Sequence, residues 1–145
     1  MKSNVIILDA NFILLPFQFK IDYLKEIRNN VEGKLKFIVY QQILDELEAK
    51  EKRESRATKF KKLLSSGLLY LKNNENIHVI DYVNDIKGEN ENTDDFLLRK
   101  VIDLKGTFKS VFLATNDSEL RNRSKKLSIS VIFLRQKKYL SFERA

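Results

Sequence analysis

The sequence predicts an α/β domain in which a mainly parallel sheet carries helices on both faces. Short apolar runs, rich in β-branched and aromatic residues, alternate along the chain with longer segments whose apolar residues recur at helical spacing. Buried parallel strands have continuous apolar runs, and alternation of strand and helix is typical of a sheet covered on both sides. In such folds, ligands bind beyond the carboxyl ends of the strands.

The apolar runs predict five strands, at residues 5–8, 37–40, 77–80, 111–114 and 131–134. Helical spacing predicts a helix in each interval, at residues 17–30 behind Pro16, 41 to about 64, 93 to about 105, and 117 to about 126. Gly33, Gly67 and Gly106 fall just past three of these helices, where glycine is favoured. Leu68, Leu69 and Leu71 fit either a short helix or an extra strand.

Length and composition restrict the class of protein. The 145 residues predict one domain over residues 1–145, and 43% hydrophobic residues are enough for a core. The chain has no cysteine, which excludes disulfides, thiolate zinc sites and cysteine nucleophiles and suits a reducing, cytoplasmic compartment. No apolar stretch is long enough for a signal peptide or a membrane span, so we expect neither.

Two carboxylates directly follow predicted strands. Asp9 comes after the first strand and is trailed by Asn11, and Asp117 comes just past the fourth strand. The alternative is structural, because Asp and Asn form turns after strands and Asp caps helices. If the sheet is parallel, both side chains point into the same crevice.

Asp94 and Asp95 open the helix predicted from residue 93. With 100° per residue, Asp94 lies near the middle of the apolar stripe and Asp95 at its margin; the stripe contains Leu97, Leu98, Val101, Ile102 and Lys105. An inward carboxylate is costly to desolvate unless a cation or donors meet it. The alternative is that Thr93 caps the helix and both acids complement its dipole.

A third acidic group, Asp45, Glu46 and Glu48, opens the helix predicted from residue 41. Periodicity does not choose among these three acids. Carboxylates that converge without basic partners repel one another, and a divalent cation removes that repulsion. Oxygen ligands without His or Cys select Mg²⁺ or Mn²⁺, which suits phosphodiester hydrolysis.

Four segments resemble the acidic motifs of the PIN-domain nucleases, in order and at suitable spacing. They are Asp9-Ala-Asn11, Asp45-Glu46-Leu-Glu48, Thr93-Asp94-Asp95-Phe-Leu-Leu and Ala114-Thr-Asn-Asp117. The likeness covers nearly the whole chain. The last two motifs are most similar to the Fcf-type branch, whose eukaryotic members cut precursor ribosomal RNA, and the VapC toxins form the neighbouring branch.

The resemblance implies a three-layer PIN-like domain with strand order 3-2-1-4-5 and a metal-dependent endoribonuclease that leaves 5′-phosphate and 3′-hydroxyl ends. Carried over by position, the catalytic and metal-binding acids are Asp9, Glu46, Asp94 and Asp117, with Asp95 as a further candidate ligand and Mg²⁺ or Mn²⁺ as the metal. Accessory polar positions are Asn11, Thr115 and Asn116, and Glu119 is a candidate outer ligand.

A basic surface completes the prediction. The chain has 27 basic and 20 acidic residues, a formal charge of +7, which favours a polyanion such as nucleic acid or an anionic membrane surface. Residues 121–138 contain no acid. Arg121, Arg123, Lys125 and Lys126 are predicted RNA contacts, the alternative being a solvated helix face. Tyr139 fits either base stacking or capping of the core.

The sequence and the resemblance fit three functions: an endoribonuclease of ribosomal or other RNA maturation, a VapC-like toxin ribonuclease held by an antitoxin, and a PIN-like RNA-binding module without turnover. The expected partners are RNA, a second copy in a homodimer, and an antitoxin or a ribosome-assembly protein, with no membrane partner.

Overall fold

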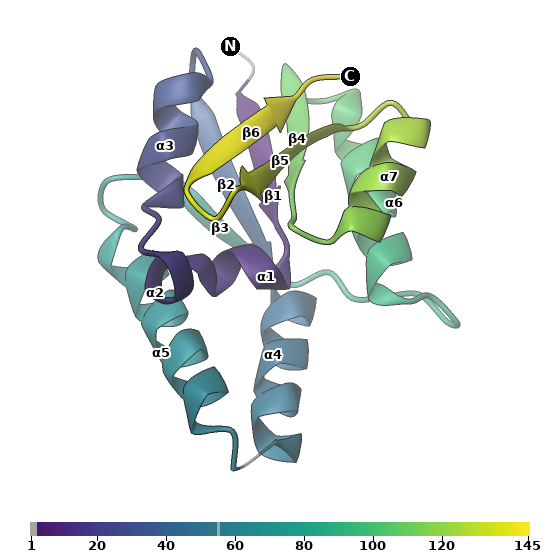
Figure 1. The fold of residues 1–145 in the computed structure, drawn as a ribbon. Helices are drawn as coiled ribbons and strands as arrows, with labels where there is room; N and C mark the ends of the chain where they lie inside the picture. The colour runs from purple at the N-terminus through teal and green to yellow at the C-terminus, as the bar shows by residue number, and fades with distance from the viewer. Residues whose placement is uncertain (1–2, 55) are drawn as a thin grey trace.

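The computed structural model describes residues 3–54 and 56–145, which form one six-stranded sheet of order β3-β2-β1-β4-β5-β6 (Figure 1). The strands are β1 Asn4–Leu8, β2 Leu35–Tyr40, β3 Ile80–Val83, β4 Ser110–Ala114, β5 Ser130–Arg135 and β6 Tyr139–Glu143. The first five are parallel, and β6 pairs with β5 in the antiparallel direction. The predicted mainly parallel α/β fold with order 3-2-1-4-5 is confirmed, and a sixth strand extends it.

Helices flank the sheet on both sides. They are α1 Ala10–Ile13, α2 Leu15–Phe19, α3 Tyr23–Asn30, α4 Gln41–Arg53, α5 Thr58–Asn73, α6 Thr93–Lys105 and α7 Ser118–Lys126. In Figure 1, α3 lies to the left of the strands and α6 and α7 lie together to the right. None of the helices in the described residues combines the length and apolar character needed to cross a bilayer.

The prediction of one continuous helix at 17–30 is wrong, because the chain makes two short helices there, the end of α2 and α3. Pro16 lies in the first turn of α2, where its missing N–H does no harm. Lys20 adopts a left-handed conformation (φ 55°) that ends α2, and the Asp22 side chain accepts a hydrogen bond from Lys25 N (3.4 Å) to start α3. The sequence pattern shows the apolar spacing but not this local break.

The long helix predicted from residue 41 is also divided, into α4 and α5, and Gly67 lies inside α5 rather than past a helix end. The reason for glycine at this position is packing. A Cβ on Gly67 would lie 2.1 Å from the backbone oxygen of Ile13, so only glycine lets α5 approach α1 this closely. Leu68, Leu69 and Leu71 belong to α5.

Both edges of the sheet differ from the prediction. β3 begins at Ile80 rather than at residue 77, because His78 N bonds to Asn74 O (3.0 Å) in the turn that follows α5. At the other edge, the β5–β6 turn places Gln136 and Lys137 at positive φ. Hairpin turns usually use Asn or Gly at positions of positive φ, so the sequence carries no ordinary hairpin signal.

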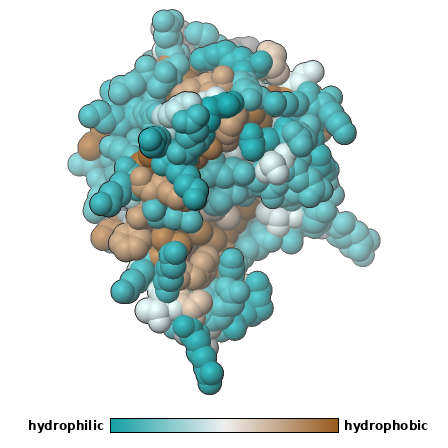
Figure 2. Space-filling model, viewed as in Figure 1, coloured by the Kyte–Doolittle hydropathy of each residue, from teal (hydrophilic) through white to brown (hydrophobic). Residues whose placement is uncertain are grey.

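The central strands carry the core and position the site. All five residues of β1 are buried, and β4 pairs with it in register from Asn4↔Ser110 to Leu8↔Ala114. Asp9 N then donates to Ala114 O (3.0 Å), so the two strands end side by side. Figure 2 shows hydrophobic residues gathered over α1 and α2 on this face and hydrophilic residues over α6 and α7.

We expect Gly67→Ala to destabilise the protein by about 1–3 kcal/mol, because the added methyl meets backbone that cannot move independently. Urea unfolding followed by circular dichroism measures the change. Gly106→Ala is the matched control, since nothing lies within 4 Å of a Cβ there and its stability should stay within about 0.5 kcal/mol of wild type. Equal stability of both variants would contradict the close approach of α5 to α1.

Candidate active site

Asp9 is a nearly buried carboxylate at the carboxyl end of β1, with 7% of its surface exposed. Its Oδ1 accepts from Ala10 N (2.7 Å), and its Oδ2 accepts from Thr115 Oγ1 (2.7 Å) and Asn11 Nδ2 (3.3 Å). Burial raises the pKa of Asp9, the hydrogen bonds from Thr115 and Ala10 oppose that shift, and the charge of Asp117 adds to it.

The segment after β4 places its polar residues beside Asp9. Asn116 N donates to Asn11 Oδ1 (2.9 Å), and Asp117 N donates to Thr115 Oγ1 (3.1 Å). Asn116 Oδ1 in turn accepts from Leu134 N of β5 (2.8 Å). Thr115 and the two asparagines thus tie the ends of three strands together, and Asp117 caps α7 by accepting from Leu120 N (3.0 Å).

Asp94 lies close enough to Asp9 and Asp117 for their charges to affect its pKa. Burial raises its pKa, the charges of Asp117, Asp9 and Glu119 raise it further, and the charge of Arg123 lowers it. Asp94, Asp9 and Asp117 therefore form one group of mutually repelling carboxylates, with Glu119 at its margin. The side chain is half-buried, consistent with the inward direction expected from helical periodicity.

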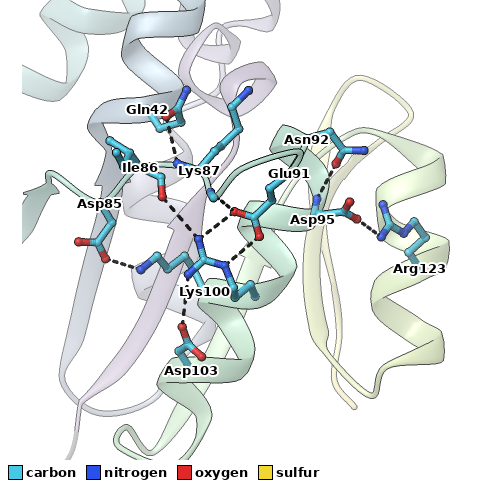
Figure 3. Close-up of polar contacts among 12 residues, drawn as sticks. Gln42, Asp85, Ile86, Lys87, Glu91, Asn92, Asp95, Lys100, Asp103 and Arg123 are labelled. Atoms are coloured by element: carbon cyan, nitrogen blue, oxygen red, sulfur yellow. Dashed lines mark hydrogen bonds and ion pairs between the residues drawn. The ribbon is translucent and has the colours of Figure 1, made fainter.

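Asp95 faces a different neighbour. The cap of α6 is Asn92, whose Oδ1 accepts from Asp95 N (2.8 Å), so the alternative of a Thr93 cap is wrong. The Asp95 carboxylate, 44% exposed, pairs with Arg123, which reaches across from α7 (Figure 3). This ion pair joins α6 to α7 beside the carboxylate group.

Glu46 stands apart from the other three acids, on α4. Its Oε1 accepts from Thr93 Oγ1 and from Lys87 Nζ (3.4 Å), and its Oε2 is buried without a hydrogen-bond partner among residues 3–54 and 56–145. With Asn11 and Thr93 it lines a cleft of about 380 Å³ whose other walls include Leu14, Ile43, Leu47 and Phe60. Asn11 is common to this cleft and to the Asp9 network.

The loop before α6 holds Lys87 in place. Lys87 N donates to Gln42 Oε1 (3.3 Å), and Gly88 N donates to Glu91 Oε1 (2.8 Å). Glu91 also pairs with Arg99 (2.8 Å), whose hydrogen bonds lower the Glu91 pKa to about 2. Figure 3 shows this polar network between the loop and α6. No pattern in the sequence singles out Lys87, because its contact with Glu46 spans 41 positions.

The predicted RNA contacts divide into paired and unpaired cations. Arg123 is paired with Asp95 and Lys125 with Glu143 (2.7 Å), whereas Lys126 is exposed. Arg121 makes no ion pair within the described part of the chain, and its guanidinium lies 4.0 Å from the ring centre of Phe133. Phe133 was not predicted to be a functional residue, because in the sequence it is one of the apolar residues of a predicted strand.

The mainly parallel sheet carries Asp9 and Asp117 beyond the ends of its two central strands, and Asp94 lies at the start of the adjoining helix. The protein is therefore an α/β fold with an acidic site at the strand ends. A model of the PIN like domain family matches residues 6–137, and the chain belongs to this family. The predicted membership of the PIN superfamily is confirmed.

The relatives agree with this membership. The chain is 30% identical over 134 residues to "Ribonuclease VapC4" of Methanocaldococcus jannaschii, covering 92% of each chain. Among solved structures, the PIN domain endonuclease Utp24 superposes with a TM-score of 0.68 at 21% identity, over 97% of this chain and 92% of that one. A domain of a functionally unknown protein from the same archaeon gives 0.63 at 16% identity, over 93% and 92%. At these identities the two structures support the fold.

We expect Asp94→Asn to be more stable than wild type at neutral pH in chelator. Because the folded state raises the pKa of Asp94, its charge destabilises the fold above that pKa. The penalty fades as pH falls through the raised pKa and is lost below the ordinary value near 4, where both states are protonated. Urea unfolding at pH 7 and at about pH 3 measures the difference.

Asp103→Asn is the control, because Asp103 is an exposed acid on the same helix, 3.9 Å from Arg99. This variant should gain no stability at neutral pH. Equal or lower stability of Asp94→Asn at pH 7 would mean that the carboxylates do not repel one another as the structure indicates.

Proposed function

We propose that this protein is a Mg²⁺- or Mn²⁺-dependent endoribonuclease. The observation that carries the proposal is the group formed by Asp9, Asp94 and Asp117, which approach one another at the ends of β1 and β4 and the start of α6 and form no ion pair with a basic residue of the described chain. Membership of the PIN like domain family and the likeness to a ribonuclease support it.

The donor set fits a hard divalent cation. All candidate ligands are oxygens, Asp9 and Asp94 have pKa values raised by burial and by the charges of neighbouring acids, and Glu46 keeps one buried oxygen without a donor among the described residues. Among residues 3–54 and 56–145, no three acidic or histidine side chains already surround one metal position. Ligation therefore requires side-chain rearrangement, because Asp9, Asp117 and Glu46 now accept hydrogen bonds from protein groups.

Asp9, Asp94 and Asp117 would hold the cation, with Glu46 on the α4 side and Glu119 as an outer ligand; Asp95 is less suited, since it pairs with Arg123. When bound, such a cation activates water and neutralises charge at the scissile phosphate. Thr115 and Asn11 orient the Asp9 carboxylate, and Asn116 fixes the β5 end beside it. The +7 chain then attracts the polyanion to the acidic site.

Asp9→Asn should lower Mn²⁺-dependent cleavage of single-stranded RNA by on the order of 10²- to 10³-fold while the circular dichroism spectrum persists. Labelled RNA resolved on a denaturing gel, with a chelator lane, measures it. Glu46→Gln should also lose activity, and Asp45→Asn should keep it, because Asp45 is exposed and bonds only to Gln41 (3.0 Å) among the described residues. RNA binding without cleavage by wild type would support the non-catalytic module instead.

RNA maturation is the physiological role that the Fcf-type motif likeness favours. A second candidate is a toxin ribonuclease controlled by an antitoxin, and the observation that favours it is the 30% identity to a VapC ribonuclease across 92% of both chains. The two roles use the same acids, so they differ in the RNA target and in the protein partner.

Induced expression in a bacterial host separates the two roles. A toxin should arrest growth within a few generations, Asp9→Asn should abolish the arrest, and co-expression of a small neighbouring gene product should relieve it. Normal growth with abundant wild-type protein, active on RNA in vitro, would contradict the toxin role and leave maturation.

A further inference from the structure

The face of the β5–β6 hairpin next to α7 carries an unusual group of side chains. Phe133 is only 6% exposed, yet it does not belong to the main apolar cluster of the described residues. Two guanidinium groups cover it: Arg121 from α7 lies 4.0 Å from the ring centre, and Arg135 lies 5.2 Å from it. One buried ring thus supports two cations.

Arg121 is not neutralised by an acid. No carboxylate lies within ion-pair distance of it in the part of the chain that the structure describes, and its buried Nε lacks a hydrogen-bond acceptor there. The ring of Phe133 therefore supports the guanidinium, whose charge has no acidic partner among the described residues. An arginine whose face is stacked keeps its edge donors in a fixed fork that suits a phosphate.

Arg135 is only weakly neutralised by an acid. It approaches Glu143 at 3.8 Å, but the arginine is 47% exposed and Glu143 already binds Lys125 at 2.7 Å. A long, exposed ion pair of this kind contributes little. Arg123, in contrast, is bound to Asp95 on the other side of α7, so α7 carries one engaged and one available arginine.

The position of the group ties it to the acidic site. Arg121 N donates to Asp117 O (3.0 Å), so Arg121 stands one helical turn from a proposed metal-binding acid. Arg135 follows Leu134, whose N–H bonds to Asn116. Tyr139 is the cross-strand neighbour of Arg135 and is 43% exposed, so an aromatic surface lies beside the second arginine.

We propose that Arg121 and Arg135, stacked on Phe133, form a phosphate clamp for single-stranded RNA, with Tyr139 as the platform for one base. The clamp rests on the proposed nuclease function and extends it, because it assigns the path of the strand: away from the acids, past the start of α7 and over the β5–β6 hairpin. Stacking on an aromatic ring accepts any base, so the clamp recognises the single strand rather than a sequence.

Binding in chelator tests the clamp independently of cleavage. Fluorescence anisotropy with a labelled 12-nucleotide single-stranded RNA should show Arg121→Gln and Arg135→Gln each binding about tenfold more weakly. Each should also reduce the slope of log affinity against log salt by about 0.7, the value for one phosphate contact to a single strand. Lys34→Gln, an exposed lysine after the Gly33 turn at the other end of the sheet, should bind like wild type.

Two further variants test the stacked geometry. Arg121→Lys keeps the charge but not the planar stack, and should bind RNA severalfold more weakly than wild type. Tyr139→Ala should weaken RNA binding but not binding of inorganic polyphosphate, which has phosphates and no bases, whereas Arg121→Gln and Arg135→Gln should weaken both. Circular dichroism identifies any variant that fails to fold, and Arg135 at the exposed strand end provides a second test if Arg121→Gln does.

Wild-type affinity of both arginine variants, or equal affinity of Arg121→Lys and wild type, would overturn the clamp. Failure of the nuclease proposal has a different signature: no cleavage by wild type in Mn²⁺, with RNA binding still weakened by the arginine variants. Cleavage that depends on Asp9 together with unchanged binding by the arginine variants would leave the nuclease and remove the clamp.

Discussion

The structure depends on the pairing of β1 with β4, because that pairing decides where the acids meet. Asp9 follows β1 directly and Asp117 lies three residues beyond β4. Since the strands are parallel and in register, the backbone positions that carry the two carboxylates stay side by side as long as the most buried part of the sheet is intact. The repulsion between them is therefore imposed by the fold. Groups of carboxylates whose mutual repulsion raises their pKa values are typical of functional sites.

The surrounding cations are arranged so that this repulsion persists. Arg99, Lys100 and Arg123 each have an acid of their own outside the group, at Glu91, Asp85 and Asp95. Lys87 reaches Glu46 but at 3.4 Å, with Glu46 Oε2 left without a donor. Within the described residues these basic side chains thus surround the site without forming ion pairs with Asp9, Asp94 or Asp117, which suits the proposed binding of a cation there. The same arrangement leaves Arg121 without an acidic partner in that part of the chain, as the proposed phosphate clamp requires.

The features that the sequence predicted correctly are those determined by interactions between residues close in the chain and by strong apolar patterns. The continuous apolar runs found β1, β2, β4 and β5 within two residues at each end, and the helix opened by Thr93 begins and ends where expected. Helical periodicity also distinguished Asp94 from Asp95, because one position on a helix changes direction by 100°. Glu46 was singled out from Asp45 and Glu48 only by resemblance, and the structure adds the physical reason: Asp45 and Glu48 are exposed.

What the sequence could not predict comes from contacts between distant segments or from unusual backbone. Lys87 and Glu46, or Arg121 and Phe133, are brought together only by the fold. The β5–β6 turn uses Gln and Lys at positive φ, a conformation that costs energy in residues other than glycine or asparagine. This turn pairs Arg135 with Tyr139, so that both side chains lie on one face of the hairpin beside the acidic site. The strand β6 and the turn before it are thus the part of the sheet that the sequence did not predict, and they complete the surface to which the proposed phosphate clamp belongs.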